Sequence, residues 1–218
     1  MTDKPTTATP EKTVYNDRRK TTRAWYSDGR PPHEFYMRGG ICWPYSEYAG
    51  VRTQLQGYAV LCGQDVNTGT VYVLDHIDFK TIDPMIDQKT QVVIHSGVSE
   101  WFNNCWSKWY CRKYYWHDMS TTSRAYRITV SRSKMCEPKP SFPEAKWQDY
   151  DSVRALWITM AMTKQFVADA GLIAELKKPE SMEAKLHPPT HSIVCALVGL
   201  NMHPWTEPKM RRDDVLRI

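Results

Sequence analysis

The chain has 218 residues, a formal net charge of +5 and 12% aromatic residues, among them nine tryptophans. At this length it can bury roughly two-thirds or more of its unfolded surface, so disulfides and metal ions are not required for stability. The N-terminus lacks the apolar segment of a signal peptide, and the longest apolar run, 193–200, is far below the roughly 18 residues that span a bilayer. We therefore expect a soluble, intracellular protein of the cytoplasm without a membrane partner.

Positive charge is concentrated in one part of the chain. Residues 100–140 contain eight Lys or Arg against three acidic residues, whereas residues 50–99 contain three against five. This asymmetry favours an anionic partner more than the total charge does.

The first 45 residues contain few signs of regular structure. Residues 1–24 are rich in Thr, Lys and Arg and poor in apolar side chains, which predicts a flexible basic arm. The charged side chains of this arm are Arg18, Arg19, Lys20 and Arg23. Residues 25–45 alternate turn-forming pairs such as Gly39-Gly40 with aromatic residues, which predicts an irregular segment anchored by its rings.

Strand patterns follow in the middle of the chain. The β-branched and aromatic runs 57–66 and 70–79 are separated by Asn67-Thr68-Gly69, which predicts a hairpin. Residues 90–95 are a third predicted strand. A fourth covers 124–133, where Tyr126, Ile128 and Val130 alternate with polar side chains.

Helical spacing of apolar residues predicts four helices. They are an embedded amphipathic helix from residue 98, a helix capped by Asp151-Ser152 and ending at Gly171, a short helix over 172–178 that could also extend the preceding one, and a buried helix over 190–202. Prolines 138, 140 and 143 predict a stiff connector before the second of these. The expected fold is α+β: an aromatic-rich domain over 25–150 with a mostly antiparallel sheet, followed by a helical portion over 151–218 that packs on it.

The stretch around WSKWYCRKYYWH, residues 106–117, combines aromatic and basic side chains. One helical face would carry Val98, Trp101, Phe102, Cys105, Trp106, Trp109 and Tyr110, and such a stripe usually packs in a core. Five residues lie off this stripe or beyond the helix end: Lys108, Arg112, Lys113, Tyr115 and Trp116. Arg127 and Arg132 add positive charge nearby. Basic groups beside exposed rings suit single-stranded nucleic acid, although a solvated basic rim is an alternative.

The sequence gives little support for a metal site or for a reactive cysteine. The six cysteines form no CxxC pair, so we expect reduced, mostly buried thiols. Cys105 and Cys111 would point about 120° apart on a helix, which disfavours a zinc site with His117. His191 and Cys195 share a helical face, but a buried thiol is the simpler interpretation.

Three carboxylates in the predicted hairpin suggest a metal-dependent nuclease as a further possibility. With Val66 opposite Val71, Asp75 would face Cys62, and Asp65 would lie about 10 Å away along the strand. Asp75 and Asp78 would point to opposite faces of the sheet. A two-metal site from these residues alone is therefore disfavoured.

The leading interpretation is a non-enzymatic component of a multi-protein assembly that binds DNA or RNA. We expect single-stranded or backbone-directed contacts through Lys108, Arg112, Lys113, Arg127 and Arg132, with Tyr115 or Trp116 stacking. We expect other protein subunits as partners, and no cofactor, metal or catalytic residue. A structural subunit of a virion or large enzyme is the alternative, and a metal-dependent nuclease is the third. Sequence motifs for nucleotide-binding loops, zincins and serine hydrolases are absent.

Overall fold

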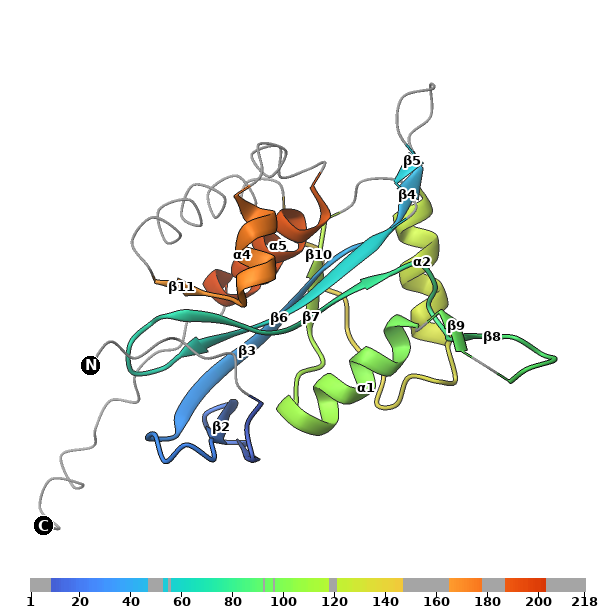
Figure 1. Cartoon of the computed structure of the whole chain (residues 1–218). Helices are drawn as coiled ribbons and strands as arrows, with labels where there is room; N and C mark the ends of the chain where they lie inside the picture. Colours follow the sequence, from blue (N-terminus) through green and yellow to red (C-terminus); the bar gives the residue numbers. More distant parts are fainter. Residues whose placement is uncertain are drawn as a thin grey trace, which may run out of the picture.

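The computed structural model describes residues 9–46, 53–54, 56–91, 93–95, 97–117, 121–146, 165–177 and 187–202. Within these ranges it has a seven-stranded mixed sheet, mostly antiparallel, and four helices, which confirms the predicted α+β fold (Figure 1). No helix in the described ranges is long and apolar enough to cross a membrane.

Seven strands build the main sheet, in the order β1-β2-β3-β6-β7-β11, with β10 also paired to β3. These strands are β1 (Lys12–Asn16), β2 (Thr21–Trp25), β3 (His33–Cys42), β6 (Gly57–Asp65), β7 (Val71–Phe79), β10 (Tyr114–Trp116) and β11 (Phe166–Val167). Only the pairs β10–β3 and β11–β7 are parallel among these strands. Two ribbons pair β4 (Tyr45–Ser46) with β5 (Thr53–Gln54) and β8 (Met85–Ile86) with β9 (Val93–His95).

Helices cover both faces of the central strands. The helices are α1 (Val98–Trp109), α2 (Thr121–Arg132), α4 (Ala170–Leu176) and α5 (Pro188–Met202). In Figure 1, α4 and α5 lie together on one side of the strands and α1 lies on the other. Successive residues of β6 therefore point into two different cores, and Val60 packs in the α5 cluster while Leu61 packs in the α1 cluster. Burial on both faces explains why this strand is apolar at almost every position.

The buried helix predicted over 190–202 is confirmed by α5, which lies directly on the backbone of β3. A Cβ atom on Gly40 would overlap the carbonyl oxygen of Ser192, so only glycine permits this approach. On the same helix, a Cβ atom on Gly199 would overlap the ring of Tyr115. These two glycines set how closely helix and sheet pack.

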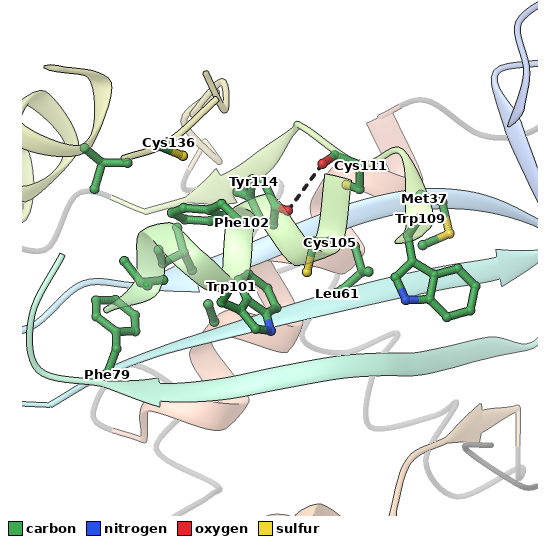
Figure 2. Packing of buried hydrophobic residues seen from close by; sticks show 14 of the residues in the cluster. Met37, Leu61, Phe79, Trp101, Phe102, Cys105, Trp109, Cys111, Tyr114 and Cys136 are labelled. Carbon is green, nitrogen blue, oxygen red and sulfur yellow. Dashed lines mark hydrogen bonds between the residues drawn. The ribbon is translucent and has the colours of Figure 1, made fainter. Parts of the chain in front are cut away.

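The aromatic stripe of α1 is largely a core face, as the sequence predicts. Its buried members are Val98, Trp101, Phe102, Cys105 and Trp109. Figure 2 shows Phe102 and Tyr114 packed together beside Trp101, and the hydroxyl of Tyr114 donates a hydrogen bond to the carbonyl oxygen of Cys111. Trp106 and Tyr110, the other two stripe residues, are only partly buried.

The prediction of a flexible arm is wrong for residues 12–24, which form β1 and β2 at the edge of the sheet. The carboxylate of Glu34 is buried and accepts a hydrogen bond of 2.5 Å from the hydroxyl of Thr21. It also lies 3.5 Å from the guanidinium groups of Arg19 and Arg23. An edge hairpin held by polar contacts needs few apolar residues. The low apolar content of this segment therefore does not indicate that it is flexible. Residues 1–8 lie outside the described ranges.

Two further predictions of local structure are wrong. The irregular segment expected over 25–45 contains β3, the longest strand in the described ranges, in which Gly39 and Gly40 allow close packing. The strand expected over 124–133 is helix α2. Tyr126 and Val130 pack toward the α1 core at i and i+4, whereas Ile128 is exposed. Over so few residues, the apolar positions fit the two-residue period of a strand as well as the i, i+4 spacing of a helix.

The C-terminal predictions hold in part. The short helix is confirmed as α4, but Gly171 is near its start and not at the end of the preceding helix. The positions 151–164 of that preceding helix lie outside the described ranges, and residues 166 and 167 form β11. The strand expected over 90–95 is confirmed only for β9. The predicted domain division near residue 150 stays a prediction.

Candidate functional site

A cleft of about 660 Å³ lies between the β1–β2 hairpin, the middle of β3 and the end of α1. We call it the basic cleft. Its lining residues are Tyr15, Asp17, Arg19, Lys20, Thr22, Tyr36, Met37, Arg38, Trp106, Tyr110, Cys111, Arg112 and Lys113. Five of these side chains are Lys or Arg, and the single carboxylate, Asp17, pairs with Lys20 at 2.6 Å. The cleft therefore favours an anionic ligand.

Aromatic rings stand beside these charges. The rings of Tyr15 and Tyr110 stack with centroids 5.6 Å apart, and Trp106 meets Tyr110 edge-on at 5.8 Å. The guanidinium of Arg112 lies over the Trp106 ring at 4.7 Å. This arrangement follows from the end of α1, where Tyr110 adopts the left-handed conformation and its N–H bonds the carbonyl oxygen of Trp106. All three rings are partly exposed and offer apolar surface to a ligand.

Arg38 is the most buried cation of the basic cleft. Its guanidinium lies 4.0 Å from the centroid of the Tyr36 ring and donates hydrogen bonds to the Tyr36 hydroxyl and the Met37 carbonyl oxygen. Burial lowers the pKa of Arg38, although a hydrogen bond with Tyr115 opposes this shift. Its Nε atom has no hydrogen-bond partner among the described residues, and no described carboxylate pairs with it. Arg38 is thus a fixed, desolvated cation.

The seven residues predicted from sequence divide into three groups. Arg112 and Lys113 line the basic cleft, and Lys108 is next to it, with its carbonyl oxygen accepting a hydrogen bond from Thr13. Tyr115 and Trp116 are only 2% and 1% exposed, so the prediction that their rings are free to stack is wrong. Both belong to β10, which is covered on one edge by β3 and on the other by residues 141–144.

Sequence reasoning missed most of the cleft. Trp106 and Tyr110 belong to the helical stripe that the sequence predicts to be buried. No local sequence pattern indicates that Tyr15 or Arg38 lines a site. The pairing of β1–β2 with β3 brings Tyr15 next to Tyr110, far away in the sequence. A register of this kind is not visible in local patterns.

Arg127 and Arg132 lie elsewhere, in a smaller groove of about 290 Å³ between α2 and residues 140–142. We call it the second groove. It is lined by Arg127, Ile128, Ser131, Arg132, Pro140, Ser141 and Phe142. The guanidinium of Arg127 lies 4.9 Å from the centroid of the buried Trp116 ring, which fixes its position.

A third cavity, of about 640 Å³, has the opposite character. The hydroxyl of Tyr58 lies 2.8 Å from Nδ1 of His76, whose Nε2 lies 2.7 Å from the Asp169 carboxylate. Asp169 also caps α4 by accepting a hydrogen bond from the Leu172 N–H, so this network joins β7 to α4. Burial raises the pKa of Asp78 on the same wall. The lining has three carboxylates and no Lys or Arg, and does not suit an anion.

The three carboxylates considered for a nuclease site have different surroundings and do not form one group. Asp65 is buried, lies 2.7 Å from Nδ1 of His33 and accepts hydrogen bonds from the following turn. Asp75 accepts a hydrogen bond of 3.0 Å from the Trp101 indole, and Asp78 lines the third cavity. The predicted pairing of Asp75 with Cys62 is wrong, because a bulge after Leu61 places Asp75 opposite that residue.

The described residues also offer no candidate metal centre. They include no group of three or more His, Cys, Asp or Glu side chains placed to hold a metal ion. All six cysteines are free and buried, as predicted. Burial raises the pKa values of Cys111 and Cys136 to about 11, which makes these thiols unreactive.

Comparison with known proteins finds no matching family, no matching curated protein and no matching solved structure. The function of the chain is therefore inferred from its own geometry and chemistry.

Proposed function

We propose that the protein is a non-enzymatic, nucleic-acid-binding component of a larger assembly, and that the basic cleft is its binding site. One observation carries this function: five cationic side chains surround partly exposed rings in a concave site whose only carboxylate is already paired. Arg112 and Lys113, which the sequence predicts as contacts, line this cleft, and Lys108 lies beside it.

The chemistry of the cleft suits a single strand. Lys and Arg neutralise backbone phosphates, and exposed rings stack on unpaired bases for about 1–3 kcal/mol each. Tyr15, Trp106 and Tyr110 supply those rings at the rim, replacing the predicted Tyr115 and Trp116. A phosphate that reaches Arg38 would gain more from its charge than at an exposed lysine, because the guanidinium is shielded from water.

Fluorescence anisotropy with labelled single-stranded DNA and RNA tests this function. We expect binding that weakens steeply with salt, with a slope of about −0.7 per phosphate contact. The double variant R112E/K113E should abolish binding. The variant K80E/K89E, which makes the same charge change at exposed sites outside the cleft, should bind like the wild type. Absence of binding at low salt, or binding insensitive to salt, would overturn the function.

Exposed apolar side chains favour a second candidate, a structural subunit that contacts other proteins. Met85, Ile86 and Val93 are 48%, 50% and 51% exposed, and their ribbon, β8–β9, projects away from the sheet (Figure 1). In that case the protein isolated from its source would carry protein subunits and little nucleic acid, as judged by a gel and by ultraviolet absorbance. I86K/V93K should lose these subunits, whereas M135K, which changes another exposed side chain, should retain them.

A further inference from the structure

We infer that the second groove continues the path of the basic cleft, so that one single strand of nucleic acid occupies both. This inference rests on the proposed function and specifies its ligand: an unpaired strand long enough to reach Arg127 and Arg132. A mononucleotide or a very short oligonucleotide would fill only the basic cleft.

Backbone pairing brings the two sites together. The N–H of Ser141 donates a hydrogen bond of 2.7 Å to the carbonyl oxygen of Arg112, and the N–H of Tyr114 donates one of 3.0 Å to that of Ser141. Lys113 and Ser141 are direct partners in a parallel bridge. Arg112 and Lys113 line the basic cleft, and Ser141 lines the second groove. The backbone of a residue that lines the basic cleft, Lys113, is therefore about one strand spacing, roughly 5 Å, from that of a residue that lines the second groove, Ser141.

The second groove has the chemistry needed to continue the path. Its charged lining residues are Arg127 and Arg132, and no carboxylate lines it. Arg127 is fixed against the Trp116 ring, so it contacts a phosphate with little loss of side-chain entropy. Ile128 is exposed and Phe142 is partly buried, and together they offer an apolar surface to a base.

Lys113 lies where the strand would pass from one site to the other. Its side chain is exposed and its backbone is held by the pairing with Ser141. The cations that would contact such a strand are Arg38, Arg112 and Lys113 in the basic cleft and Arg127 and Arg132 in the second groove. The third cavity, with its three carboxylates, does not extend this path.

Dependence of affinity on strand length tests this inference. Oligothymidylates of about 4, 8, 12 and 16 nucleotides cover the range of sites on small single-strand-binding domains. R127Q/R132Q removes both charges and retains polar side chains of similar reach. We expect this variant to bind the shortest oligonucleotide like the wild type and the longest several-fold more weakly. Its salt slope with the longest strand should be smaller by about 1.4, because two phosphate contacts are lost.

Three outcomes separate this inference from the proposed function. If the wild type binds no oligonucleotide at low salt, the proposed function itself fails. If the wild type binds but R127Q/R132Q matches it at every length, the basic cleft acts alone and the inference is overturned. Equal weakening at every length also overturns it, because the second groove would then not be a distal extension. K80Q/K89Q controls for the change in net charge, and circular dichroism checks that each variant is folded.

Discussion

The guanidinium of Arg112 lies 4.7 Å from the centroid of the Trp106 ring, at the point where α1 ends and the chain turns toward β10. The two side chains join a cation and a partly exposed ring on one wall of the basic cleft. Trp101, on the same helix, is instead buried in the core. We therefore expect Trp106 to contribute mainly to ligand binding and Trp101 mainly to the stability of the fold.

We expect W106A to weaken single-strand binding by about 1–3 kcal/mol, the range for loss of one stacking ring, and to change the free energy of unfolding little. W101A should destabilise the fold by about 3–5 kcal/mol, because it leaves a cavity beneath α1. Anisotropy titrations and urea denaturation measure the two effects. Wild-type affinity in W106A would remove this ring from the site.

Arg38 should contribute more to binding than to stability. R38M retains most of the length of the side chain and removes both a charge whose pKa burial lowers and the hydrogen bonds to Tyr36 and Met37. These effects oppose each other, so the free energy of unfolding should change by no more than about 1–2 kcal/mol. Binding should weaken, and R38K should be intermediate because it retains charge without the planar stack on Tyr36. A destabilised R38M with unchanged affinity would show that Arg38 is only structural.

Substitution of Gly40 tests the contact between α5 and β3. G40A should destabilise the protein by about 1–3 kcal/mol or more, because the added methyl group overlaps the backbone at Ser192. G171A is the matched control: its Cβ would lie 3.1 Å from Asp169 Oδ1, and alanine favours the helix. Denaturant melts of both variants give the comparison, and an unaffected G40A would contradict the close packing.

Part of the free energy of unfolding should depend on the ionisation of Asp169 and should be lost at low pH. Burial raises its pKa, but hydrogen bonds from Leu172 and His76 outweigh burial and leave the pKa below its ordinary value. A lowered pKa stabilises the fold above the ordinary aspartate pKa of about 3.9, and this contribution is lost as the pH falls through the folded-state value. D169N should lack this loss between about pH 5 and pH 2 in urea melts. D169A should in addition lose the helix cap, about 1 kcal/mol, at neutral pH.

The six buried cysteines should react slowly in the folded protein. Burial raises the pKa of Cys42 to about 12 and that of Cys136 to about 11, so very little thiolate is present near neutral pH. A chromogenic disulfide reagent should therefore label the native protein only over hours and all six thiols at once in denaturant. Rapid labelling of any native thiol would show that its site opens.

Elements with one strong local pattern were predictable. The hairpin of β6 and β7 and the helices α1 and α5 each combine a continuous apolar pattern with a clear turn or proline boundary. Helix α2 was misassigned because its Tyr126 and Val130 fit alternation as well as an i, i+4 step. The strand β3 was missed because Gly39 and Gly40, read as turn formers, serve close packing against Tyr114 and α5.

The sequence pointed to four of the cations that line the basic cleft: Arg112 and Lys113 as site residues, and Arg19 and Lys20 as charges of the N-terminal arm. Trp106 and Tyr110 lie on the helical stripe, and their partial exposure depends on where the helix ends and what packs beside it. Arg38 and Tyr15 join them through strand pairing between distant segments. Patterns within one element indicate a buried face, but they do not show which elements meet at a surface.

Tyr115 gives the floor of the basic cleft a rigid support. Its ring packs against Gly199 of α5, and the proximity of Tyr115 to Arg38 opposes the lowering of the Arg38 pKa by burial. The guanidinium is therefore positioned by the hydrophobic core and not by a loop. Most of the conformational entropy of Arg38 is lost when the chain folds, so little remains to be lost when a phosphate arrives. The side chain of Arg38 is thus preorganised for binding, and its conformation should be the same in the free and the ligand-bound protein.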